Sequence, residues 1–269
     1  MRAARFVVTC TESNRQYLRK LLDSVGAWAR GHGTRPTSHV PRPIMVNYHG
    51  VDLERFVPAP KADEKLCRIL AVGSLLPCKG FETLVEACRE LKDRGLAFHC
   101  TIAGGGRLRR SLEHLIARRE LQDHVTITGT VSQETVVRFY QSAHLFVLPT
   151  VSKIHWGIPN VLIEAMAMKT PVICCPLPSL GELIEPGESG WVIPEGDPQA
   201  LASAMQSLWA DPSRRAHLAH AGYQRVVERF SLERTGKQLR EIFGTGAMGQ
   251  GTCPTPHAPC PKPIVAVSS

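Results

Sequence analysis

One carboxylate in this sequence stands where it could serve a ligand, namely Glu164 within residues 156–167. The apolar run at 144–149 predicts a buried strand, after which the chain turns through Gly157 and Pro159 into a helix expected to begin near Asn160. The free N–H groups and partial positive charge at a helix N-terminus suit a phosphate. Glu164 would lie about one turn inside this helix, where a carboxylate can accept hydrogen bonds from two neighbouring sugar hydroxyls.

A phosphate site beside a carboxylate that binds a diol indicates a nucleotide. An ordinary strand, turn and helix with a surface glutamate explains the same residues equally well. The predicted strands and helices around this segment are therefore needed to distinguish these two interpretations.

These elements alternate between strands and helices from residue 67 onward, which predicts an α/β fold with a Rossmann-like, doubly wound parallel sheet. Ligands of such sheets bind at the carboxyl ends of the strands. Gly73, Gly104, Gly129 and Gly157 each lie just beyond a predicted strand, so we expect them to line one rim, which favours a nucleotide cleft. The predicted strands are 67–72, 97–103, 125–128, 144–149, 171–174 and 190–193, and the predicted helices are 81–94, 104–119, 132–143, 160–167, 197–209 and 211–230.

A second candidate for phosphate binding follows the first of these strands. Lys79 comes six residues after Gly73, so the glycine could let a diphosphate approach the backbone while the lysine neutralised it. The residue order is not that of a Walker A loop, and these residues alone favour an ordinary surface lysine. Two later carboxylates, Glu182 and Glu185, are expected to be solvated.

The composition is that of an ordinary globular chain, because 43% of the 269 residues are hydrophobic and 21% are charged. No apolar run approaches the length of a membrane span, and the run at 6–10 is too short for a signal peptide, so we expect a cytoplasmic protein. Nine cysteines are present without paired C-x-x-C motifs, so no metal site is expected.

Positive charge is concentrated near the N-terminus. The net charge is +8, and residues 1–42 contain eight Lys or Arg against Glu12 and Asp23. Such a segment can bind nucleic acid, an anionic membrane surface or a phosphorylated substrate, or it can be a solvated basic helix. No basic stripe interleaved with aromatic residues is present, so nucleic acid is the least favoured partner, and peripheral contact with the inner membrane face stays open.

Several segments taken in order resemble the nucleotide-binding half of a retaining glycosyltransferase of family 4, which has the GT-B fold. The resemblance covers roughly residues 44–243, and its most specific part is the central segment with the Pro-Val-Ile that follows. Residues 11–14 and 49–56 also resemble the end of the first domain and the crossover linker of this family. The central segments are 72–81 (V-G-S-L through K-G-F), 103–106 (A-G-G-G), 129–131 (G-T-V), 157–167 (G-I-P-N-V-L-I-E-A-M-A), 171–173 (P-V-I) and 190–194 (G-W-V-I-P).

The resemblance implies a nucleotide-diphospho-sugar donor, transfer with retention to a glycan or lipid-linked acceptor, and no cofactor or bound metal. Lys79 would pair with the diphosphate, and Glu164 would bind the ribose hydroxyls. The base would lie near Gly129 and Val131. Backbone groups around the start of the central helix would hold the distal phosphate and the sugar, namely those of Gly157, Ile158, Pro159, Asn160 and Val161.

Three features depart from the family pattern. Ser74 replaces an arginine, so one cation for the diphosphate is missing. Trp156 replaces the acidic residue that contacts the donor sugar in relatives, and an indole can stack on a sugar but cannot accept a hydrogen bond. Only about 50 residues precede the linker, so we expect a truncated first domain.

The expected organisation has four parts. Residues 1–64 form the remnant of the N-terminal GT-B domain with its linker, and residues 65–230 form the nucleotide-sugar-binding domain. A C-terminal helix spans 231–243. Residues 244–269, rich in Gly, Pro, Thr and Ser, are expected to be disordered.

The departures leave a second hypothesis open, which is a catalytically impaired relative that binds a nucleotide or a partner without turnover. A nucleotide-sugar epimerase of the same fold is a third and weaker option, because it would convert the donor without an acceptor.

Overall fold

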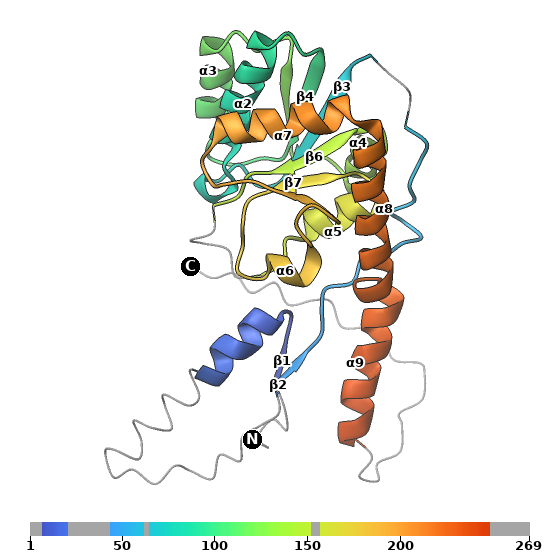
Figure 1. The fold of residues 1–269 in the computed structure, drawn as a ribbon. Coiled ribbons are helices and arrows are strands. Elements are labelled where there is room, and N and C mark those ends of the chain that lie inside the picture. Colours follow the sequence, from blue (N-terminus) through green and yellow to red (C-terminus); the bar gives the residue numbers. More distant parts are fainter. Residues whose placement is uncertain (1–6, 21–43, 62–64, 152–156, 248–269) are drawn as a thin grey trace, which may run out of the picture.

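A six-stranded parallel sheet is the largest element of the computed structural model, which describes residues 7–20, 44–61, 65–151 and 157–247 (Figure 1). The spatial order of the strands is β5-β4-β3-β6-β7-β8, and every neighbouring pair is parallel. The predicted α/β fold is therefore confirmed. The strands are β3 (Cys67–Val72), β4 (Phe98–Ala103), β5 (Val125–Gly129), β6 (Leu145–Leu148), β7 (Val172–Cys174) and β8 (Trp191–Val192).

Helices cover both faces of this sheet, because consecutive strand residues point to opposite sides. In β3, Ile69 packs into a core cluster with α2, α3 and α7, whereas Leu70 packs into a second cluster with α4, α5, α6 and α8. Both residues are fully buried. The helices are α2 (Phe81–Asp93), α3 (Arg109–Arg118), α4 (Gln133–Ser142), α5 (Asn160–Ala167), α6 (Leu180–Leu183), α7 (Pro198–Ala210) and α8 (Pro212–Arg229).

Three helix starts follow the expected capping chemistry. Ser132 Oγ accepts from Thr135 N at 3.3 Å at the start of α4, and the side chain of Asp197 accepts from Ala200 N at 2.8 Å at the start of α7. Asp211 caps α8 in the same way. These sequence signals were sufficient because each cap is local to its helix.

Other boundaries differ from the predictions. Helix α3 begins at Arg109 and not at Gly104, because the intervening glycines hydrogen-bond to neighbouring turns. The short helices α6 and η1 (Pro77–Lys79) were not predicted, since neither is long enough to show a periodic pattern.

The N-terminal part adds a small parallel pair, β1 (Val7–Thr9) with β2 (Ile44–Val46), and a helical segment at 12–20. Helix α9 (Leu232–Ala247) runs beside this pair in Figure 1, and Gln238 Nε2 donates to Val46 O at 3.0 Å. The helix continues to Ala247, so the first four residues of the predicted tail are helical. Residues 248–269 lie outside the described residues. No helix in the described ranges is long and apolar enough to span a bilayer.

Candidate functional site

The strand order reverses direction between β3 and β6, which makes the carboxyl ends of these two strands the topological switch point of the sheet. In open parallel sheets this is where ligands bind. The turn after β3 contains Gly73 and Lys79, and the loop after β6 leads to α5. The two are joined, since Val151 N donates to Cys78 O at 2.9 Å. The candidate residues therefore lie at the position that the topology favours.

The turns that contain Gly73, Gly104 and Gly129 lie side by side along this rim, as predicted, and hydrogen bonds join them. Gly73 N donates to Ala103 O at 3.0 Å, and Gly104 N donates to Gly129 O at 3.0 Å. A Cβ on Gly104 would collide with the carbonyl of Gly73, so the turns can approach this closely only without a side chain. The rim consequently offers backbone to a ligand without side chains in the way.

Lys79 lies against the first of these turns. A Cβ at Gly73 would be 3.8 Å from both Cδ and Cε of the lysine, which is ordinary van der Waals contact, so the lysine stem passes directly beside the glycine. Lys79 is half-buried, and burial lowers the pKa of its ammonium group from the ordinary value. Ser74 is exposed beside it.

Helix α5 begins without a side-chain cap from any of the described residues. Pro159 is the N-cap residue and not the first helical residue as the sequence suggested, and Asn160 begins the helix. Leu162 N bonds to Pro159 O, and no described side chain accepts from the N-terminal amides. An uncapped N-terminus retains donors and partial positive charge for an anion.

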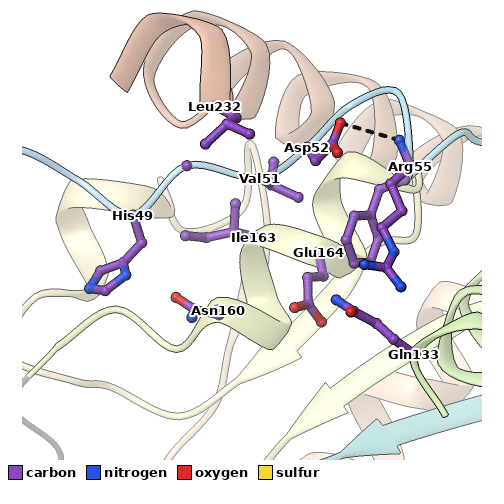
Figure 2. Close-up of a pocket in the computed structure, with 11 residues that line it drawn as sticks. His49, Val51, Asp52, Arg55, Gln133, Asn160, Ile163, Glu164 and Leu232 are labelled. Atoms are coloured by element: carbon purple, nitrogen blue, oxygen red, sulfur yellow. Dashed lines mark hydrogen bonds between the residues drawn. The ribbon is translucent and has the colours of Figure 1, made fainter. Parts of the chain in front are cut away.

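A pocket of about 200 Å³ opens beside this helix start (Figure 2). Asn160 and Glu164 of α5 contribute to one wall, Gln133 of α4 to another, and the crossover segment at 49–56 closes it from above in the view. Figure 2 shows the Glu164 carboxylate pointing toward the Gln133 amide, with Arg55 descending beside them. The full lining is His49, Gly50, Val51, Asp52, Arg55, Phe56, Gln133, Asn160, Ile163, Glu164 and Leu232.

The surroundings of Glu164 shift the pKa of its carboxyl group in opposite directions. Burial raises the pKa of this carboxyl above its usual range, whereas a hydrogen bond from Tyr140 and the positive charge of Arg55 act in the opposite direction. Tyr140 Oη lies 3.0 Å from Glu164 Oε2. Arg55 is also 3.3 Å from Glu134 Oε1, in an exposed ion pair. The site thus holds a partly desolvated acid with one oxygen engaged by the protein.

The predicted site residues divide into two groups. Asn160 and Glu164 line the pocket, whereas Gly73, Ser74, Lys79 and Gly129 belong to the glycine-rich rim. Val131, Gly157, Ile158 and Val161 do not line this pocket, so the donor-binding roles that the resemblance implies for them stay predictions. Trp156 lies outside the described residues.

Tyr140, Arg55 and Gln133 were not predicted as neighbours of Glu164, although residues 49–56 were predicted to resemble a crossover linker. Tyr140 falls on the apolar face of α4, where an aromatic residue is ordinary core. The expectation for Glu182 was wrong. Its carboxylate accepts from Glu12 N at 2.7 Å and from Ser13 N at 3.1 Å, so it caps the helix at 12–20.

Comparison with known proteins identifies related sequences. The family model "Glycosyl transferases group 1" matches residues 53–225. Amylovoran biosynthesis glycosyltransferase AmsK of Erwinia amylovora is 36% identical over 204 residues, which cover 74% of this chain and 50% of AmsK. Alpha-D-kanosaminyltransferase of Streptomyces kanamyceticus is 35% identical over 175 residues, covering 65% of this chain and 45% of the relative. The chain therefore spans about half the length of these relatives.

Solved structures give the same result for the fold, which is similar to that of GT-B glycosyltransferases. Sucrose-phosphate synthase from Thermosynechococcus elongatus superposes with a TM-score of 0.73 at 27% identity, covering 90% of this chain and 58% of that chain. The C-terminal domain of LpcC, a glycosyl transferase group 1 family protein from Francisella tularensis, has a TM-score of 0.60 at 22% identity. It is covered completely by 68% of this chain.

Proposed function

Because the chain belongs to the glycosyl transferases group 1 family, we propose that it binds a nucleotide-diphospho-sugar and transfers the sugar, with retention, to a glycan or lipid-linked acceptor. Within the family we assign it to the retaining family 4 type. The observation that carries the proposal is the half-buried Glu164 at the pocket beside the uncapped start of α5. The amylovoran biosynthesis glycosyltransferase and the kanosaminyltransferase among its relatives support glycosyl transfer as the general reaction.

In this proposal the ribose hydroxyls donate to the carboxylate of Glu164, and the amides at the start of α5 hold the distal phosphate. Lys79 approaches the diphosphate from the turn after β3. Negative charge grows on the nucleoside diphosphate as it leaves the sugar, and a helix N-terminus with a lysine stabilises that charge without a proton transfer. A diphosphate held in this way needs no bound metal.

A catalytically impaired relative that binds nucleotide without turnover is the alternative, and Ser74 and Trp156 favour it. Ser74 removes one positive charge from the rim, and Trp156 removes an acidic group expected near the donor sugar. Both changes would leave the diol-binding carboxylate intact. Binding and turnover must therefore be measured separately.

The test is calorimetric binding of a panel of nucleoside diphosphates and nucleotide sugars to the full chain. We expect one base to be preferred, with Glu164→Ala weakening binding by about tenfold or more, since a carboxylate accepting from a diol makes charged hydrogen bonds. Glu188→Ala is the control, because that exposed carboxylate pairs only with His217 among the described residues. Folded protein that binds no member of the panel would overturn the proposal.

Turnover is then assayed with the preferred donor in the presence and absence of acceptor lipids and glycans. Release of nucleoside diphosphate that depends on acceptor supports transfer, and conversion of donor without acceptor would indicate an epimerase. Binding without either reaction supports the impaired relative. In that case Trp156→Glu combined with Ser74→Arg is expected to restore transfer.

A further inference from the structure

Tyr140 stands directly behind Glu164, on the side of the carboxylate away from solvent. The tyrosine is fully buried. Its ring packs edge-on against Phe56 of the crossover segment, with ring centroids 6.2 Å apart, and lies 5.6 Å from the ring of Phe146 in β6. Contacts on two sides therefore hold the ring in place, and the position of the ring fixes the position of the hydroxyl group.

The hydroxyl group bonds to α5. Tyr140 Oη lies 3.0 Å from Glu164 Oε2 and 3.2 Å from the carbonyl oxygen of Val161. A phenol carries one hydrogen, and the ionised carboxylate is the stronger of the two acceptors, so the proton is donated to Oε2. This bond occupies one oxygen of Glu164 and leaves Oε1 with its full capacity to accept.

The backbone of Tyr140 is held as firmly as its side chain. Its carbonyl oxygen accepts from Thr170 Oγ1 at 3.3 Å and from Lys61 Nζ at 3.5 Å. Lys61 belongs to the linker and Phe56 to the crossover, so the first-domain side of the molecule contacts Tyr140 at two points. Tyr140 is thus a rigid support placed between the crossover and the carboxylate.

We propose that Tyr140 is a positioning residue for donor binding: its hydroxyl fixes Oε2 of Glu164 so that Oε1 is presented to the ribose diol. The inference rests on the proposed function of Glu164. Tyr140 itself is too deeply buried to touch the ligand, so it acts only through the carboxylate. Its contribution should therefore depend on ligand groups that Glu164 binds.

This dependence gives a test that a merely structural role would fail. Binding of the preferred nucleoside diphosphate and of its 2′,3′-dideoxy analogue is measured by calorimetry for wild type, Tyr140→Phe, Glu164→Gln and the double variant. Tyr140→Phe retains the ring and its packing against Phe56 and Phe146. The matched control is the same substitution at Tyr223 of α8, whose ring lies under the ammonium group of Lys169.

We expect Tyr140→Phe to raise the dissociation constant of the ribose ligand about tenfold, and that of the dideoxy analogue less than about twofold. In the Glu164→Gln background the tyrosine substitution should also have little effect. Equal weakening of both ligands, or no weakening of either, would overturn the inference. Failure of wild type to bind any nucleoside diphosphate would overturn the proposed function instead.

The pH dependence of binding provides a second readout. Removing the donated hydrogen bond leaves the ionised carboxylate less stabilised, so Tyr140→Phe should lose affinity at a higher pH than wild type as the medium is acidified. His49, Asp52 and Arg55 also line this pocket, and they are unchanged in the comparison. Identical pH profiles for the two proteins would contradict the role assigned to Tyr140.

Discussion

At the scale of single residues, Gly80 shows how tightly the two halves of the switch point are packed. It ends η1 and precedes α2 with a φ of +67°, and a Cβ there would collide with the carbonyl oxygen of Pro149 after β6. A side chain would thus suffer both backbone strain and a clash with main chain that cannot rotate away.

The substitution Gly80→Ala should therefore destabilise the protein more than a glycine replacement for which only φ matters. Gly95 is the matched position, because its φ is +72° and a Cβ would meet no atom within 4 Å. We expect Gly95→Ala to lower the free energy of unfolding by about 1 kcal/mol, and Gly80→Ala by about 1–3 kcal/mol more. Urea denaturation of both variants measures this, and equal losses would mean that the contact with Pro149 yields easily.

Within the site, some residues could be predicted from the sequence and others could not. Glu164 and the rim glycines follow from local pattern, because each occupies a fixed place after a strand or within a helix. Tyr140 and Arg55 lie 24 and 109 positions from Glu164 in sequence, and only the packing of α4 and the path of the crossover bring them together. No local periodicity encodes that approach.

At the scale of elements, Lys61 attaches the linker to the C-terminal end of α4. Its ammonium group lies within hydrogen-bonding distance of the carbonyl of Ala143 and is 2.6 Å from Thr170 Oγ1. Burial, with a smaller contribution from the charge of Arg215, lowers the pKa of Lys61 from 10.5 to about 7. The unfolded chain therefore binds more protons than the folded protein above about pH 7.

This difference makes stability rise with pH across the window between the folded and unfolded pKa values, about 7 to 10.5. Below pH 7 the lysine is protonated in both states and the dependence disappears. We expect the free energy of unfolding of wild type relative to Lys61→Met to increase between pH 7 and 8.5, as measured by urea denaturation. A difference that stayed constant or fell over this range would contradict the lowered pKa.

The alternation of strands and helices could be predicted because each element is long enough to display its period. The predicted helix boundaries were wrong where backbone hydrogen bonds, rather than side-chain patterning, determine the helix ends. The turn at 104–108 bonds to the turns after β3 and β5, which delays the start of α3 to Arg109. The end of α9 was misjudged because glycines within 244–247 suggested a tail, whereas the helix continues.

At the scale of the whole molecule, Glu182 joins the N-terminal part to the larger sheet. It lies in α6 and accepts from the main-chain amides of Glu12 and Ser13 and from Ser13 Oγ, the last at 2.9 Å. A helix whose cap comes from a distant element is ordered by that element as well as by its own sequence. The capping bonds thus fix the 12–20 helix to the sheet unit.

We therefore expect Glu182→Ala to accelerate hydrogen exchange in residues 7–20 by roughly fivefold to thirtyfold, corresponding to the loss of a charged helix cap. Exchange is measured by mass spectrometry on the full chain. Glu188→Ala, which removes another carboxylate from the same stretch of chain, should leave residues 7–20 unchanged. Unaltered exchange in the Glu182 variant would show that this helix is held by other contacts.

The chain passes between the two sheets twice in the described residues, and the two passages are bonded to each other. Val51 N donates to Phe230 O at 2.8 Å, and Leu232 N donates to Val51 O at 2.8 Å. Pulling the small sheet away from the large one would have to break both bonds, whereas turning it about this pair would break neither. Val51 and Ser231 therefore form a pivot, about which the small sheet could turn only after the bonds from Glu182 to the 12–20 helix had broken.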